Sequence, residues 1–419
     1  MRVQRCKGTR DLSPEDMESF RLIEGVFRGS CRKWGYEEVR TPTLEYLHLF
    51  TTTGTLTPGM LSKVYSFLDW DGWSGERVVL RPDGTIPVVR LYIDSMAEKK
   101  LAKLFYVANV FIFEATGKKT RERWQCGAEL IGVSSPTADV ELITLALDVL
   151  QQLKLEGIQL RLSHIGLIRA LLQEFGLSGK QQTKMFDQIL DGNGEALVRI
   201  KPTRPELEEA LSLLLNLKGK SSGFLKNLQV LFNQHLPELK PHIDNFINVV
   251  DLLEALGCNY QIDITSGKGF EYYTGVLFQF FKDEEKIGGG GRYDALIPLM
   301  GGGSIPASGF ALYLDRLMNL VKLEPLAGAE RILIRAEVGE IEALKGGSNI
   351  ASSLREAGYV TELDLGSREL ADFRWILDVS KGPLFVLSDQ VKHRKFKVQT
   401  AKEVWAILGE EGADKTSFA

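Results

Sequence analysis

Two stretches of the chain, about a dozen residues apart, carry residue types that suit the binding of a small polar ring. The first begins at Lys268 and reads Lys-Gly-Phe-Glu-Tyr-Tyr-Thr-Gly, and the second, at residues 288–294, reads Gly-Gly-Gly-Gly-Arg-Tyr-Asp. Tyr272 and Tyr273 offer phenol hydroxyls and flat aromatic walls for a ring such as imidazole. The glycines allow a ligand or another backbone to come close. Either stretch alone is also typical of a β-hairpin with a Gly-rich turn, but the pair indicates a binding site.

Two further pairs of polar residues follow or lie within strand-like segments. Asp83 and Thr85 come just after one such segment, and a carboxylate with a hydroxyl two residues on can hold an ammonium group. An Asp-Gly turn is the alternative there.

Gln125 and Glu129 lie four residues apart on a predicted strand, so their side chains face the same side. The alternative for this pair is the polar face of an exposed strand.

The tyrosine and glycine stretches resemble the two histidine-specific motifs of the histidyl-tRNA synthetase family, usually Arg-Gly-Leu-Asp-Tyr-Tyr-Thr-Gly and Gly-Gly-Arg-Tyr-Asp. The same motifs occur in a non-catalytic branch of that family, the regulatory subunits of the short-form ATP phosphoribosyltransferase. The resemblance covers about residues 5–320 well and the remainder loosely. It implies a pocket for L-histidine formed by seven residues: Asp83, Thr85, Gln125, Glu129, Lys268, Tyr272 and Tyr273.

The arginines that activate the amino acid in a working synthetase are mostly missing. The second class II motif normally reads Phe-Arg-x-Glu, but residues 111–114 read Phe-Ile-Phe-Glu, so Ile112 replaces the arginine that braces the carboxylate and the α-phosphate. Loss of one such preorganised donor costs on the order of 10²–10³-fold in rate. Lys268 stands where the first histidine motif has its arginine, and lysine loses the bidentate geometry. Arg316 matches the third-motif arginine, and Arg121 lies in the motif 2 loop.

The resemblance therefore assigns no catalytic residue to this chain. Arg121 and Arg316 are expected only as residual phosphate-binding positions, and an exposed arginine near a helix start is more typical of a surface ion pair. The segment Arg-Pro-Asp-Gly-Thr-Ile-Pro at residues 81–87 also differs from the Arg-Pro-Glu-Gly-Thr-Ala of the synthetases and is more similar to the regulatory subunits.

Local patterns predict the elements that would position these residues. Ser13 and Pro14 start a helix over residues 14–34, and a strand over residues 35–42 follows, closed by a proline. This order resembles the first class II motif, which builds the homodimer interface in the family. Residues 106–132 predict a strand, a polar loop and a strand, residues 138–153 an amphipathic helix, and residues 161–166 a strand and a turn. His164, at that turn, is assigned no role.

The predicted fold is α+β, with a class II synthetase-like antiparallel sheet flanked by helices. It divides into a histidine-binding domain over residues 1–322, with a helical insertion at about 166–257, and a small α/β domain over residues 328–419. That second domain sits where synthetases keep their anticodon-binding domain. Its segments predict strands paired largely in parallel: strands at residues 331–336, 360–365 and 383–388, helices near 346–357 and 367–380, a basic hairpin at 392–397, and a last element at 402–408.

The composition and charge of the chain favour some classes of protein and disfavour others. The chain has 419 residues, of which 44% are hydrophobic and 25% charged, and a formal net charge of −4, as is ordinary for a soluble globular protein. Four scattered cysteines without CxxC spacing predict neither a zinc site nor a disulfide framework. The polar start and the lack of a long apolar run predict a cytoplasmic protein with no membrane span. From residue 330 onward, 13 Lys and Arg against 15 Asp and Glu disfavour tRNA binding.

The hypothesis that results is a regulatory subunit of ATP phosphoribosyltransferase. It would pair with the short catalytic subunit, be required for the first step of histidine biosynthesis, and let histidine regulate that step, without a cofactor or metal of its own. Two alternatives stay open. One is a divergent histidyl-tRNA synthetase, which the C-terminal domain and Arg316 favour. The other is a free-standing histidine-binding paralogue with a different partner.

Overall fold

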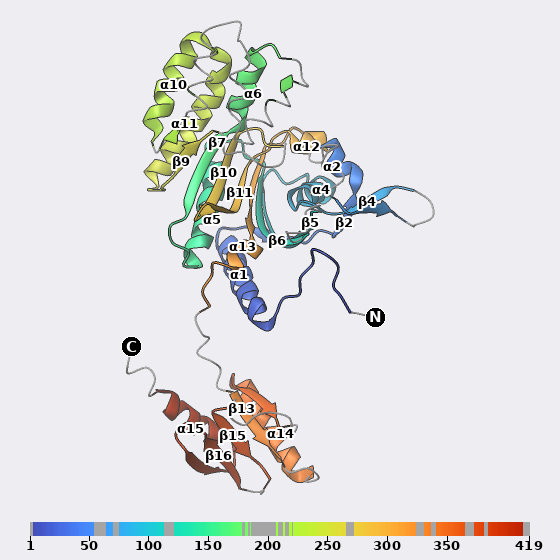
Figure 1. The fold of residues 1–419 in the computed structure, drawn as a ribbon, viewed down its shortest axis with the longest axis vertical. Helices are drawn as coiled ribbons and strands as arrows, with labels where there is room; N and C mark the ends of the chain where they lie inside the picture. The colour runs from blue at the N-terminus through green and yellow to red at the C-terminus, as the bar shows by residue number, and fades with distance from the viewer. Residues whose placement is uncertain are drawn as a thin grey trace. The chain divides into compact units, whose positions relative to one another are not determined.

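The computed structural model describes most of the chain and divides it into two compact units, Met1–Lys322 and Leu323–Ala419 (Figure 1). The described residues are 3–53, 64–69, 75–112, 121–177, 221–264, 272–323, 331–336, 341–364, 373–380 and 384–413, with isolated positions between 178 and 220. Within these ranges no helix is both long and apolar enough to cross a membrane.

A large, mostly antiparallel sheet forms the centre of the first unit. Its described strands run in the order β1, β5, β6, β12, β11, β10, β7, β9, β8. The pairs β1–β5 and β7–β9 are parallel, and the others are antiparallel. In the same order the strands span Glu37–Glu38, Ala102–Phe111, Glu122–Ile131, Ala307–Tyr313, Glu285–Arg292, Val276–Lys282, Gln159–His164, Gln261–Asp263 and Lys218–Gly219.

One face of this sheet is covered by α1 (Pro14–Lys33), α5 (Pro136–Gln152) and α13 (Leu314–Met318). The start of α1 is fixed by a capping box, in which the backbone N–H of Asp16 donates to Ser13 Oγ at 3.1 Å and that of Ser13 donates to Asp16 Oδ2 at 2.9 Å. Such caps stabilise a helix start by about 1 kcal/mol. Apolar side chains of these helices and of alternate strand residues form the largest core, so the opposite strand positions remain for a site.

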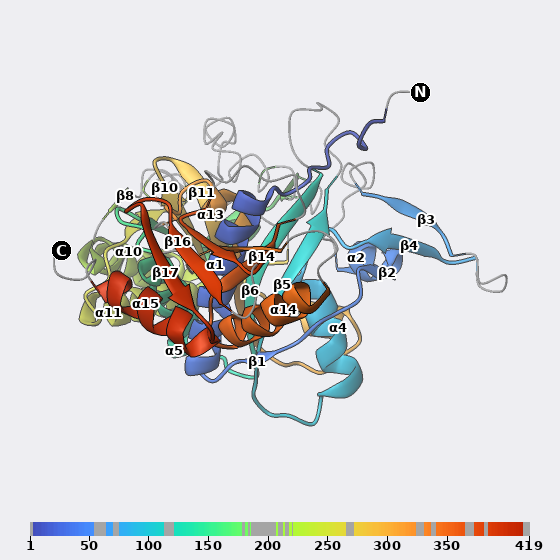
Figure 2. The ribbon, with the colours of Figure 1, turned by 90° about the horizontal axis from the view of Figure 1, so that it is seen from below.

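The other face carries smaller elements that frame the site: α2 (Leu47–Thr52), α4 (Thr85–Ser95), α12 (Leu296–Leu299) and an antiparallel sheet of β2 (Leu44–Tyr46), β4 (Arg77–Leu80) and β3 (Ser66–Leu68). Figure 2 shows this small sheet beside α2. Arg81, buried behind β4, donates to the carbonyls of Thr41 at 2.9 Å, Pro42 at 3.1 Å and Asn109 at 2.8 Å. These bonds hold the segment before α4 against β5.

The described part of the insertion is largely helical: α6 (Ile165–Glu174), α10 (Ser222–His235), a 3₁₀ turn (Pro237–Leu239) and α11 (Lys240–Ala255). Figure 1 shows α10 and α11 side by side next to β9.

Two details differ from the sequence predictions. Helix α6 starts directly after β7, where a turn was expected, because His164 Nδ1 accepts the Leu167 N–H at 3.2 Å and caps it. The short strand β8 also pairs within a region expected to be helical.

The predicted strand over residues 35–42 is much shorter, since only Glu37–Glu38 pairs with β5. The glycines at 288–291 are not a turn either. They lie inside β11, and the β10–β11 hairpin turns at Asp283 and Glu284, whose φ angles are +49° and +63°.

The second unit is a sheet in the order β14 (Val360–Leu363), β13 (Arg331–Arg335), β15 (Trp375–Asp378), β16 (Phe385–Asp389), β17 (Arg394–Val398), with α14 (Ile341–Glu356) and α15 (Ala401–Ala413). Only the pairings of β13 with β14 and β15 are parallel, so the sheet is mixed and not largely parallel as predicted. The helix predicted near residues 367–380 is also wrong for its described part. Residues 375–378 form the buried strand β15, because tertiary pairing outweighs a helical pattern in so short a segment.

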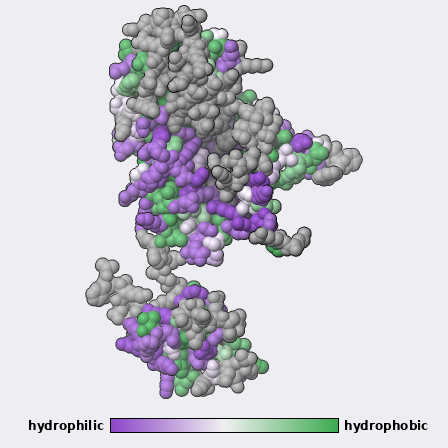
Figure 3. Space-filling view, viewed as in Figure 1, coloured by the Kyte–Doolittle hydropathy of each residue, from purple (hydrophilic) through white to green (hydrophobic). Residues whose placement is uncertain are grey.

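The hydropathy of one face of the molecule is shown in Figure 3. In the second unit, the predicted basic hairpin at residues 392–397 lies on the β16–β17 turn and along β17, with most of its side chains exposed.

Candidate functional site

A small cavity of about 60 Å³ lies on the face of the large sheet opposite α1 and α5. Its walls include five of the seven residues predicted to bind histidine: Asp83, Thr85, Gln125, Tyr272 and Tyr273. Glu129, the sixth, contacts the wall from behind. The seventh, Lys268, lies outside the described residues. Residues separated by up to 190 positions in the sequence are therefore brought to one place.

The floor of the cavity consists of small residues that leave room above the sheet. Gly289 pairs with Ala311, and Ala311 pairs with Gly127 on the next strand. Larger residues do not fit here. A Cβ on Gly289 would lie 2.7 Å from the Phe278 carbonyl oxygen, and one on Gly290 would lie 2.0 Å from the Gly309 carbonyl oxygen. The glycine run of the second histidine-like motif thus serves close strand packing beneath the cavity.

Glu129 is fully buried behind one end of the cavity wall. Its carboxyl group accepts a hydrogen bond from Thr85 Oγ1 at 2.8 Å and another from the Tyr293 hydroxyl. Burial raises the pKa of Glu129 to about 8, and the nearby charge of Asp83 acts in the same direction, although the two hydrogen bonds oppose the shift. At neutral pH Glu129 is therefore mostly protonated. A neutral carboxyl beside two hydroxyls can both donate to and accept from a polar ring.

Asp83 binds the backbone at the start of α4 and also lines the cavity. It is buried and accepts the backbone N–H of Thr85 at 3.1 Å and that of Ile86 at 3.2 Å, at the start of α4. Burial raises the pKa of Asp83 to about 6, against the effect of these hydrogen bonds. The carboxylate is mostly ionised at neutral pH, so it offers a fixed negative charge to a cationic group in the cavity.

The remaining walls are aromatic and amide groups. The rings of Tyr272 and Tyr273 lie 4.9 Å apart between centroids, and Tyr272 meets the edge of Tyr293 at 5.7 Å. Gln125 Oε1 is buried and meets no hydrogen-bond donor among the described residues. A buried acceptor without a partner costs about 1–3 kcal/mol. A ligand that carries N–H groups would remove this cost.

Arg292 fixes the end of β11 beside Tyr293. Its Nη2 lies 3.0 Å and its Nε 3.1 Å from Asp139 Oδ2 on α5, and its Nη1 donates to the Val133 carbonyl at 3.0 Å. Both charged side chains are almost fully buried, with 5% and 0% of their surface exposed. Burial raises the pKa of Asp139 to about 6 even though Arg292 favours the ionised form. The pair therefore anchors the segment that carries Tyr293 to the helical face of the sheet.

The residues considered for phosphate binding lie away from this cavity. Arg121 donates from Nη1 to the Tyr65 hydroxyl at 3.1 Å, and its side chain packs against Gly8. Arg316 is partly exposed and forms an ion pair with Glu285. Ile112, at the end of β5, bonds only through its backbone N–H to the Arg121 carbonyl among the interactions described, and it brings no charge.

Sequence reasoning missed several side chains near the cavity. Tyr106 on β5 packs its hydroxyl against Gly84 and Gly127. Tyr313 and Lys286 line the cavity from β12 and β11. Lys286 precedes the glycine run by two positions, and only the strand pairing reveals which face it occupies.

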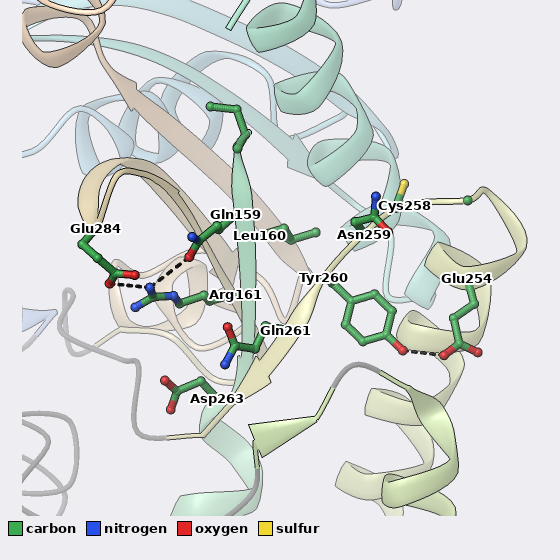
Figure 4. A pocket seen from close by; sticks show the side chains of 12 residues that line it. Gln159, Leu160, Arg161, Glu254, Cys258, Asn259, Tyr260, Gln261, Asp263 and Glu284 are labelled. Atoms are coloured by element: carbon green, nitrogen blue, oxygen red, sulfur yellow. Dashed lines mark hydrogen bonds and ion pairs between the residues drawn. The ribbon is translucent and has the colours of Figure 1, made fainter. Parts of the chain in front are cut away.

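A larger hollow of about 850 Å³ lies elsewhere, at the edge of the sheet between β7, β9 and the end of α11 (Figure 4). Arg161 lies there over the Phe281 ring at 4.1 Å, and its Nη2 donates to Gln159 Oε1 at 3.1 Å and to Glu284 Oε2 at 2.6 Å. None of the predicted site residues lines this hollow. The small cavity is the better candidate despite its size, because its polar groups converge from several elements.

Comparisons with known proteins identify the family of the chain. The histidyl-tRNA synthetase family matches residues 8–317. The chain is 51% identical to the ATP phosphoribosyltransferase regulatory subunit of Dehalococcoides mccartyi, over 98% of this chain and 100% of that protein. It is 35% identical to the histidine-tRNA ligase of Methanosarcina acetivorans, over 85% of this chain and 83% of that protein.

Solved structures support the fold alone, since their identities are low. An ATP phosphoribosyltransferase regulatory subunit/histidyl-tRNA synthetase from Bacillus halodurans has a TM-score of 0.77 at 23% identity, over 90% of this chain and 98% of that one. The histidyl-tRNA synthetase from Nostoc has a TM-score of 0.75 at 16% identity, over 99% and 100%. The predicted α+β, class II synthetase-like fold is thereby confirmed. The chain belongs to the histidyl-tRNA synthetase family and, within it, to the ATP phosphoribosyltransferase regulatory subunits.

Proposed function

We propose that this protein is a non-catalytic regulatory subunit that binds L-histidine in the small cavity and acts on the short catalytic subunit of ATP phosphoribosyltransferase. In this role it is required for the first step of histidine biosynthesis and lets histidine regulate that step. One observation carries the proposal. Five of the seven residues predicted to bind histidine line one cavity, while Ile112 occupies the position of the arginine that activation needs.

The amino group and the ring of a histidine molecule each have a suitable partner at the cavity. The negative charge of Asp83 suits the α-ammonium group. The imidazole ring suits the end formed by Glu129 and Tyr293, where a protonated carboxyl and a hydroxyl are close together. Tyr272 and Tyr273 supply flat walls for the ring. Lys268 remains a predicted contact.

The size of the cavity supports a regulatory role. A volume of about 60 Å³ has room for only a few water molecules, so we propose that the walls move apart when histidine binds. Because a ligand shifts a conformational equilibrium by its difference in affinity for the two states, histidine stabilises the widened state. The catalytic subunit would respond to that change.

The assembly and its surroundings are part of the same proposal. The protein works in the cytoplasm as a homodimer formed through α1 and β1, bound to the catalytic subunit. It needs no cofactor or metal of its own. It does not charge tRNA, in keeping with the absent activation arginine and the net negative charge of its C-terminal region.

Three measurements on the purified full-length protein test the proposal. Histidine at 100 times its Kd should raise the stability by about 2.7 kcal/mol, which calorimetry detects as a higher thermal midpoint. Histidine-dependent exchange between pyrophosphate and ATP should be absent. Phosphoribosyl transfer should appear when the short catalytic subunit is added.

Rapid exchange together with tRNA charging would instead show a histidine-tRNA ligase. Histidine binding without rescue of the catalytic subunit would favour a free-standing paralogue.

A further inference from the structure

We propose that Lys286 binds the carboxylate of the amino acid in the cavity, and so provides the positive charge that Ile112 cannot. This inference rests on the proposed binding of histidine. It adds a residue that determines specificity: the protein would recognise the complete amino acid through a lysine on β11, without the arginine on β5.

Lys286 lies on the cavity wall near the turn of the β10–β11 hairpin. It pairs with Phe281 of β10, beyond a shift in register between Phe280 and Phe281. It lines the cavity, and its Nζ lies 6.0 Å from the centre of the Tyr313 ring, which also lines it.

The charges on the cavity walls explain why the position of Lys286 matters for binding a carboxylate. Among the described residues that line the cavity, Lys286 is the only basic one. The acidic residue on the same walls is Asp83, and Glu129 lies behind them. A carboxylate taken from water into this cavity would be costly without an opposite charge nearby. Lys286 provides that charge.

The register of the sheet separates Glu129 from Lys286. Glu129 pairs with Gly309, and Gln125 pairs with Tyr313, beside which Lys286 lies. The two side chains therefore reach the cavity from different positions along the strands. We expect a histidine molecule with its ring near Glu129 to direct its carboxylate toward Lys286.

The test compares two ligands on the full-length protein by isothermal titration calorimetry. L-histidine carries the carboxylate, and L-histidinol has a hydroxymethyl group in its place. The Lys286→Met variant should bind histidine about 10- to 100-fold more weakly, the usual effect of losing a charged hydrogen bond. Its affinity for histidinol should change by less than about 3-fold. Lys286→Arg, which keeps the charge, should retain most of the preference for histidine.

A matched control is Lys282→Met, a lysine on the same hairpin that pairs with Asp283 and does not line the cavity. It should leave both affinities unchanged. Lys268→Met, measured alongside, shows whether the predicted Lys268 contact supplies the charge instead.

Three results would overturn the assignment of Lys286. These are an unchanged affinity of Lys286→Met for histidine, an equal loss for both ligands, or a loss of preference only in Lys268→Met. Failure of the unmodified protein to bind histidine would overturn the proposed function itself, and this inference with it.

Discussion

Replacing Glu129 with glutamine should stabilise the N-terminal unit at neutral pH and weaken the dependence of its stability on pH. The ordinary pKa of a glutamate is 4.5, and burial raises that of Glu129 to about 8 in the folded protein. Between these values the folded state keeps a proton that the unfolded state has released. Stability therefore falls as pH rises through this window. Glutamine keeps an acceptor for Thr85 and does not ionise, and the Tyr293 hydroxyl can accept from its amide.

The size of the effect follows from the pKa shift. Each pH unit inside the window changes stability by up to about 1.4 kcal/mol. From pH 5.5 to pH 7.5 the contribution of Glu129 is at most about 3 kcal/mol. This corresponds to up to about 6 °C in the thermal midpoint of a unit of this size. Below pH 4.5 the variant and the unmodified protein should differ little, and above pH 8 the difference should be at its largest and constant.

Scanning calorimetry without histidine, at several pH values between 4.5 and 8.5, measures this difference directly. Only the difference between variant and unmodified protein is used, because Asp83 and Asp139 titrate in the same range. Glu98→Gln, at an exposed glutamate, serves as the control and should give a constant difference. If the Glu129→Gln difference were also constant, or shrank as pH rises, Glu129 would not be a protonated buried carboxyl and the electrostatic account of the cavity would be wrong.

Three other substitutions test the packing around the cavity. Gly309→Ala places a Cβ 1.7 Å from Glu129 Oε2 and should abolish histidine binding and lower the thermal midpoint. Gly303→Ala, whose nearest neighbour is 3.7 Å away, should do neither, and equal behaviour of the two variants in calorimetry would contradict the packing. Arg292→Met leaves Asp139 buried without its partner, so chemical denaturation should show a loss of about 3–5 kcal/mol; a loss under 1 kcal/mol would argue against a buried pair. Arg316→Ala removes an exposed ion pair with Glu285 and should cost at most about 1 kcal/mol without changing histidine affinity, whereas weaker histidine binding would place Arg316 in the site.

Local patterns predicted some elements closely. The helix expected at residues 14–34 is α1, Pro14–Lys33, because Ser13, Pro14 and Asp16 specify a helix start through bonds within one turn. The strand, loop and strand around residues 106–132 correspond to β5 and β6 in their described parts. These features depend on neighbours in the sequence, so the sequence contains the information for them.

Other elements depend on partners far away in the chain. The strand β15 lies where a helix was expected, because its residues pair with β13 and β16 and bury Trp375 between layers. The glycine run was equally typical of a turn. Its place inside β11 follows only from pairing with β10 and β12.

The sequence by itself determined which family the chain resembles and that isoleucine stands at position 112, where a synthetase has an arginine, since these residues can be read without a structure. The tertiary structure decided the charges and the protonation states around the cavity. The neutral state of Glu129 depends on its burial beside Thr85 and Tyr293, which are 44 and 164 positions away, and the place of Lys286 depends on the pairing of its strand. Burial and electrostatic environment arise from contacts between residues distant in sequence, so they exist only once the chain has folded.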